Sequence, residues 1–143
     1  MLIKTLALAA TLALSGNVAA AETIEVKMLN KGEAGAMVFE PSYVAAQPGD
    51  TILFVPTDPG HNAAAIEGAL PEGVESFKGE MGKEYSLTVE TEGLYGIECT
   101  PHVAMGMVAL IQVGKPVNLE AVQAVTLRGK AKTRFDEALA QVK

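Results

Sequence analysis

Apolar and polar residues alternate along much of the chain. Between residues 23 and 29, Ile24, Val26 and Met28 are separated by charged or polar residues, so one side of an extended segment would be apolar. This period of two predicts a half-buried β-strand. The run Thr51–Pro56, TILFVP, is almost continuously apolar and predicts a strand inside the core.

Other segments continue this pattern. Residues 37–46 are predicted to form one strand kinked at Pro41, and a Pro-Gly-Asp turn at 48–50 leads into the core strand. A short helix is predicted over Ala63–Leu70. Further strands are expected at Tyr85–Val89, Leu94–Cys99 and Met107–Val113. Several short strands separated by turns favour a β-sandwich.

Near the C-terminus, the spacing of apolar residues changes from that of a strand to that of a helix. Asn118–Val125 and Lys130–Val142 carry apolar residues at helical spacing, and Asn118 is a predicted N-cap. The expected fold is therefore an all-β sandwich followed by two C-terminal α-helices at about residues 118–142.

The first residues have the pattern of a secretory leader. Lys4 precedes an apolar run, and Ala19 and Ala21 occupy the positions of an A-x-A cleavage site. A membrane anchor is the alternative, but the apolar run is shorter than the ~20 residues that span a bilayer. We expect residues 1–21 to be removed on export to the periplasm, leaving one mature domain of residues 22–143.

The composition of the chain argues against some classes of binding partner. The chain has a formal net charge of −6 and no tryptophan, and the leader takes away only one charged residue, a lysine. Nucleic-acid binding favours a basic stripe with stacking aromatics, so an acidic domain argues against that partner. No second long apolar run follows the leader, so no membrane contact is expected of the mature domain.

A single cysteine is unusual in an exported protein, where cysteines normally pair. Cys99 must be buried and inert, bonded to another chain, or held by a metal. It opens the segment CTPHVAMGM, which also holds His102, Met105 and Met107. The only other histidine, His61, lies in the loop DPGHN.

These residues suit copper if they converge. Loops after different strands of a sandwich can gather at one end, bringing together His61, Cys99, His102 and one methionine. Soft sulfur ligands with imidazoles favour copper, whereas methionine is not a usual zinc ligand. The alternative is that Cys99 is a small buried apolar residue and that the histidines and methionines belong to loops and core.

The segment from Cys99 to Met107, Cys-x-x-His-x-x-x-x-Met, resembles the ligand loop of the type 1 copper proteins, the cupredoxins. More narrowly, EVKMLNKGEAGAMVFEP, the PGD turn, the GHN loop and the helical tail resemble the pseudoazurins. The likeness covers residues 22–143. It implies an eight-stranded Greek-key sandwich, monomeric, with one type 1 copper ion cycling between Cu(I) and Cu(II) near one end.

The resemblance also implies a role for each site residue. His61, Cys99 and His102 would be the strong ligands and Met107, rather than Met105, the long axial one. Residues beside the ligands would support them, with Asn62 bridging the two ligand loops; these are Asn62, Thr100 and Pro101. Proline has no N–H, so Pro101 cannot donate a hydrogen bond to the thiolate, and such bonds tune the reduction potential.

With four protein ligands, no position is left for a substrate, so the resemblance implies a one-electron carrier. The electron would leave through the exposed edge of His102, and apolar side chains there would form a weak docking patch suited to a transient partner. Copper nitrite reductase or another denitrification enzyme is the implied acceptor. The docking residues by analogy are Met37, Pro101, Met105, Lys31 and Lys78.

The chain departs from the family at three surface positions. Pro59, Glu80 and Glu98 stand where pseudoazurins can carry basic residues. Either the surface has drifted without effect, or the partner or its electrostatic steering differs.

Two other functions are possible for a chain with these residues. A periplasmic copper-binding or delivery protein could use the same ligands, but it would be expected to expose runs of methionine and histidine. A Cys99 nucleophile would need an oriented base, and the neighbouring Glu98 would raise the thiol pKa rather than lower it.

Overall fold

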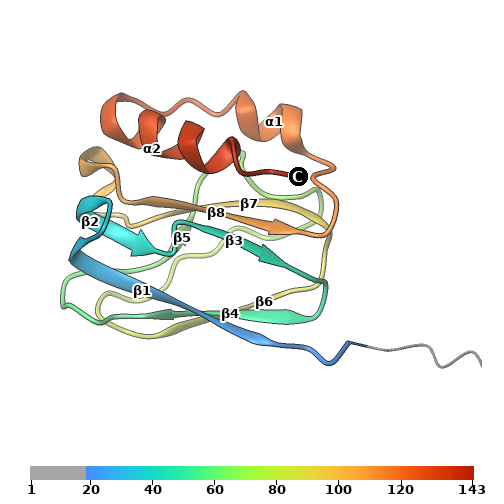
Figure 1. Cartoon of the computed structure of the whole chain (residues 1–143), viewed down its shortest axis with the longest axis horizontal. Coiled ribbons are helices and arrows are strands. Elements are labelled where there is room, and N and C mark those ends of the chain that lie inside the picture. The colour runs from blue at the N-terminus through green and yellow to red at the C-terminus, as the bar shows by residue number, and fades with distance from the viewer. Residues whose placement is uncertain (1–18) are drawn as a thin grey trace, which may run out of the picture.

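The computed structural model describes residues 19–143, so the expected leader at residues 1–21 lies outside the described part except for its last three residues. The described residues form two four-stranded sheets packed face to face (Figure 1). Their order is β2-β1-β4-β6 in one sheet and β3-β8-β7-β5 in the other. The strands are β1 (Thr23–Gly32), β2 (Gly35–Glu40), β3 (Tyr43–Ala46), β4 (Asp50–Val55), β5 (Ala64–Ala65), β6 (Tyr85–Val89), β7 (Gly93–Glu98) and β8 (Val108–Val113).

The alternating pattern of the first strand sets its register. β1 runs parallel to β4, with Ile24 beside Ile52 and Val26 beside Phe54. These apolar side chains face the second sheet and form the core between the layers. The predicted β-sandwich is therefore confirmed.

Residues 37–46 do not form one strand kinked at Pro41, so that prediction was wrong. Two strands, β2 and β3, lie on either side of Pro41. β2 pairs with β1 in the first sheet, whereas β3 pairs with β8 in the second. Proline cannot donate to a ladder and fixes its own φ, so Pro41 marks the point where the chain crosses between sheets.

The predicted helix over Ala63–Leu70 was also wrong. The segment contains β5, which pairs antiparallel with β7, followed by a turn in which the N–H of Ala69 donates to the carbonyl of Ile66. A Cβ added at Gly96 on β7 would lie 2.6 Å from the Ala69 Cβ. This close approach to β7 overrides the helix propensity of the alanines.

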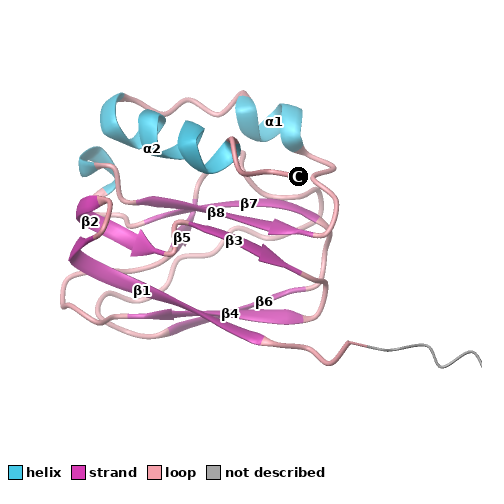
Figure 2. Ribbon diagram, viewed as in Figure 1, coloured by secondary structure: helices cyan, strands magenta, loops and turns pink. Residues whose placement is uncertain are grey.

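The two C-terminal helices lie on the outer face of the β3-β8-β7-β5 sheet (Figures 1 and 2). α1 (Leu119–Gln123) and α2 (Gly129–Leu139) confirm the predicted helical tail, although both are shorter than predicted. Phe135 of α2 packs with Leu94 and Leu110 in a second apolar core. No helix among the described residues is long and apolar enough to cross a membrane.

Asn118 occupies the N-cap position of α1, but its side chain makes no capping hydrogen bond. Instead, Oδ1 accepts from the N–H of Leu94 at 2.7 Å, and Nδ2 donates to the Leu94 carbonyl at 3.0 Å. The asparagine therefore fastens the start of the tail to β7.

Candidate metal centre

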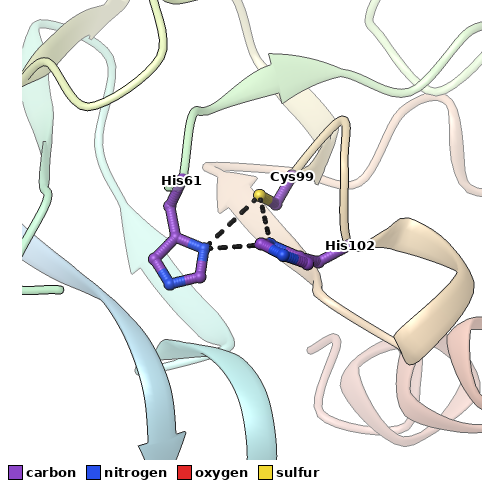
Figure 3. A group of neighbouring side chains, drawn as sticks. All are labelled: His61, Cys99 and His102. Carbon is purple, nitrogen blue, oxygen red and sulfur yellow. Dashed lines mark hydrogen bonds between the residues drawn. The ribbon is translucent and has the colours of Figure 1, made fainter. Parts of the chain in front are cut away.

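Three potential ligands from two loops meet at one end of the sandwich. His61 lies in the loop between β4 and β5, and Cys99 and His102 lie in the loop between β7 and β8. Figure 3 shows the three side chains pointing toward one another. Residues 38 positions apart are thus brought into contact by the pairing of β5 with β7.

The three ligand atoms form a nearly regular triangle. His61 Nδ1 lies 3.1 Å from His102 Nδ1, and Cys99 Sγ lies 3.7 Å and 3.5 Å from these two nitrogens. The point equidistant from them is about 2.0 Å from each atom, close to the ~2.0–2.3 Å of bonds from a metal ion to imidazole nitrogen and thiolate sulfur. The residues present therefore fit one metal ion.

Burial favours the neutral form of this site when it holds no cation. Burial raises the pKa of the Cys99 thiol, an effect only partly opposed by the backbone N–H groups of Asn62 and His102. Burial also lowers the pKa of His61, and the neighbouring His102 lowers it further. The carboxylate of Asp58 has the opposite, smaller effect and raises this pKa. A bound cation would reverse this balance by stabilising the thiolate.

Asn30 orients the first imidazole. Its Oδ1 lies 2.8 Å from His61 Nε2, so the ring donates its Nε2–H to the amide oxygen. This leaves Nδ1 unprotonated and facing the other two ligand atoms, as metal binding requires. Asn30 was not predicted from the sequence; the only signal was a polar residue directly after the alternating segment at residues 23–29.

The side chain of Asn62 lies between the two ligand loops. It is buried and hydrogen bonds to Thr100, the residue after Cys99. Pro101 is exposed, next to His102.

Met107 and Met105 differ sharply in environment. Met107 is completely buried in the core that also contains Cys99, whereas Met105 is 46% exposed. The backbone of Met107 is hydrogen bonded to both candidate ligands of its loop, Cys99 and His102. Its N–H donates to the His102 carbonyl at 3.2 Å, and its carbonyl accepts from the N–H of Cys99 at 3.0 Å.

The predicted docking residues and the acidic residues near them differ in their exposure to solvent. Lys31 and Lys78 are exposed, while Met37 is partly buried against the core. Glu80 is exposed; Glu98 is partly buried, and this burial raises the pKa of its carboxyl, against the opposing charge of Lys78.

Met81 was missed by the sequence analysis. It is 49% exposed, and the N–H of the next residue, Gly82, donates to the carbonyl of His61 at 2.8 Å. An apolar side chain is therefore presented beside the first ligand loop, where no periodic pattern could have revealed it.

The chain matches a family of known proteins over most of its length. Residues 26–114 match the family model for copper binding proteins of the plastocyanin/azurin family. Together with the two-sheet fold and the ligand triangle, this defines a cupredoxin, a protein that holds one type 1 copper ion.

Individual relatives narrow the class. The pseudoazurin of Paracoccus pantotrophus is 59% identical over 123 residues, with 85% of each chain covered. The crystal structure of native pseudoazurin from Hyphomicrobium denitrificans superposes with a TM-score of 0.81 at 48% identity, covering 85% of this chain and 98% of that one. The pseudoazurin structure from Methylobacterium extorquens AM1 gives 0.82 at 44% identity, covering 85% and 99%. The chain belongs to the pseudoazurin family, whose members are electron-transfer proteins and not enzymes.

Proposed function

We propose that this copper electron carrier works in the periplasm and donates electrons to a denitrification enzyme such as copper nitrite reductase. We further propose that the mature protein is a monomer of residues 22–143, formed by removal of residues 1–21. His61, Cys99 and His102 would hold the copper ion, with Met107 as the weak axial ligand.

The ligand triangle carries this proposal. Two buried donors and one partly buried donor lie at distances that one metal ion would bridge. Two imidazoles and a thiolate, with a thioether as a weak axial ligand, are the donor set of a type 1 copper site. When bound, copper supplies a one-electron Cu(II)/Cu(I) couple.

The surrounding residues hold the donors in place. Asn30 fixes the His61 ring, and Asn62 fixes the spacing of the two loops. The donor atoms already lie at separations that one metal ion can bridge. The ligands should therefore move little when copper changes oxidation state, and small movements favour fast electron transfer.

His102 is the proposed exit for the electron. It is the one member of the triangle that is not fully buried. Exposed Pro101 and Met105 lie in the loop that carries Cys99 and His102, and exposed Met81 lies beside the loop of His61. These apolar side chains would exclude water from a small, transient interface. Copper delivery is less well supported, because His61, Cys99 and Met107 are buried and a receiving protein could not reach them.

The charges around this surface should weaken electrostatic steering. Lys31 and Lys78 are countered by Glu80 and Glu98, and Pro59 adds no charge. Association driven by long-range attraction slows as salt screens it. A mixed surface should therefore give a shallow dependence of the reaction rate on salt.

Stopped-flow mixing of the reduced, copper-loaded domain with purified copper nitrite reductase tests this function. We expect electron transfer whose rate falls only gently with added salt. The matched control is a Pro59→Lys, Glu80→Lys variant, for which the rate should fall more steeply. Absence of electron transfer would contradict the proposed acceptor, and equally steep salt dependence in both proteins would contradict the account of steering.

A further inference from the structure

The guanidinium of Arg134, on α2, donates to four backbone carbonyls. Nη1 lies 2.7 Å from the oxygen of Met37 and 3.0 Å from that of Gly106. Nη2 lies 3.0 Å from the oxygen of Ala36 and 3.4 Å from that of Ala34. No carboxylate of the described residues forms an ion pair with Arg134, so these carbonyls are its partners.

The four carbonyls belong to two separate segments. Three belong to the β1–β2 hairpin, with Ala34 in its turn and Ala36 and Met37 in the first residues of β2. Met37 has a φ of 51°, a left-handed value unusual for a residue with a side chain. The fourth, Gly106, lies in the loop that carries Cys99 and His102. Arg134 therefore joins the helical tail to the hairpin turn and to the ligand loop at once.

The contact with the ligand loop falls on one peptide group. The carbonyl of Gly106 accepts from Arg134 and from the N–H of Val108. On the other side of the same peptide, the N–H of Met107 donates to the carbonyl of His102. The orientation of the Gly106–Met107 peptide is thus set by Arg134 at one end and by a ligand residue at the other.

Gly106 also packs closely against α2. Its φ is 92°, and an added Cβ would lie 2.8 Å from Lys130 Cγ and 3.1 Å from Arg134 Cδ. The first two turns of α2 therefore rest directly on the residue before Met107. A displacement of the helix would move the backbone that carries the axial thioether.

We propose that Arg134 is a positioning residue of the copper site, which makes the helical tail part of that site. By holding the Gly106–Met107 peptide, it fixes how near the Met107 thioether stands to the metal. The proposal rests on the proposed role of Met107 as axial ligand. Because the axial ligand tunes a type 1 copper site, a small shift of this backbone changes the balance between Cu(II) and Cu(I).

Arg134→Lys tests this role while keeping the charge and helix propensity. A lysine ammonium is a compact point charge that cannot reproduce the planar fork bridging these carbonyls. The matched control is Arg128→Lys at the only other arginine of the chain. Arg128 is exposed and makes no side-chain hydrogen bond with the described residues.

Two readouts of the copper-loaded protein are expected to move. In Arg134→Lys the ratio of Cu(II) to Cu(I) affinity should change at least threefold, a shift of roughly 30 mV in reduction potential at ~59 mV per tenfold for one electron. The relative intensities of the two thiolate-to-Cu(II) absorption bands should change with it. Arg128→Lys should match the wild type in both.

Amide hydrogen exchange of the metal-free protein gives an independent readout. The N–H groups of Met107 and Val108 should exchange at least tenfold faster in Arg134→Lys than in the wild type or Arg128→Lys. If Arg134→Lys does not fold, Arg134→Gln replaces it in each measurement. A variant that lowers the melting temperature but leaves the potential, band intensities and exchange of these amides unchanged would overturn the proposal. A wild type without intense absorption would instead refute the copper site, and the exchange data would still show whether Arg134 orders the loop.

Discussion

Asn62 and Thr100 are joined by two hydrogen bonds across the gap between the ligand loops. Asn62 Oδ1 accepts from the backbone N–H of Thr100 at 2.8 Å, and Nδ2 donates to Thr100 Oγ1 at 3.0 Å. Asn62 follows His61 in the chain and Thr100 follows Cys99. The pair therefore ties together the two loops that carry the candidate ligands His61 and Cys99.

Replacement of Asn62 by alanine should destabilise the protein and weaken copper binding. The change leaves the N–H of Thr100 without its partner and also removes a bond from Nδ2 to the Gly79 carbonyl. The contact with Gly79 is buried, and a buried group left unsatisfied costs ~1–3 kcal/mol, whereas the N–H of exposed Thr100 can bind water instead. Urea unfolding of the metal-free protein measures the loss. Thr100→Val, which removes only the hydroxyl contact, should cost less; equal stability of Asn62→Ala and wild type would contradict this role.

Met107→Leu should raise the reduction potential while keeping an intense thiolate-to-Cu(II) band. A neutral donor stabilises the more highly charged Cu(II) more than Cu(I), so its removal favours the reduced state. Met105→Leu is the control, since that side chain is exposed at the surface and not part of the core that contains Cys99. Redox titration of both variants decides between the two methionines. A shift in Met105→Leu and none in Met107→Leu would reverse the assignment.

Pro101→Ala should shift the reduction potential upward. The backbone N–H groups that already lower the Cys99 pKa are those of Asn62 and His102, and Pro101 contributes none. A new N–H at position 101 could donate to the sulfur and draw electron density away from it, which stabilises the reduced site. Voltammetry of the variant beside the wild type provides the measurement, and an identical potential would show that this N–H does not reach the sulfur.

Asp50→Asn should remove part of the acid sensitivity of folding. Asp50 accepts from the backbone N–H groups of Gln47 and Glu22, which lower its pKa in the folded state. Its stabilising effect is therefore fully present above the unfolded pKa of ~3.9 and is lost as pH falls through the lower, folded pKa. Urea midpoints should show a wild-type advantage at pH 7 that shrinks at pH 3. An advantage that grows toward acid pH would contradict this sign.

Local patterns in the sequence predicted most of the fold but not the contacts between distant segments. Alternation around Val26 and helical spacing around Phe135 depend on neighbours in the chain, so both elements were predicted correctly. The segment Ala63–Leu70 was not, because its conformation depends on the approach of Ala69 to Gly96 on another strand. The same limit applies to supporting residues of the site. Arg134 contacts a carbonyl 97 positions away, and no local pattern signals it.

Cys99 and the two histidines are placed to bind one copper ion. Titration of the domain of residues 22–143 with Cu(II), followed by visible absorption beside a Cys99→Ser control, measures this binding. We predict an intense thiolate-to-copper band that saturates at one equivalent and is absent from the control. A folded protein without that band, or with the same band in Cys99→Ser, would contradict the account.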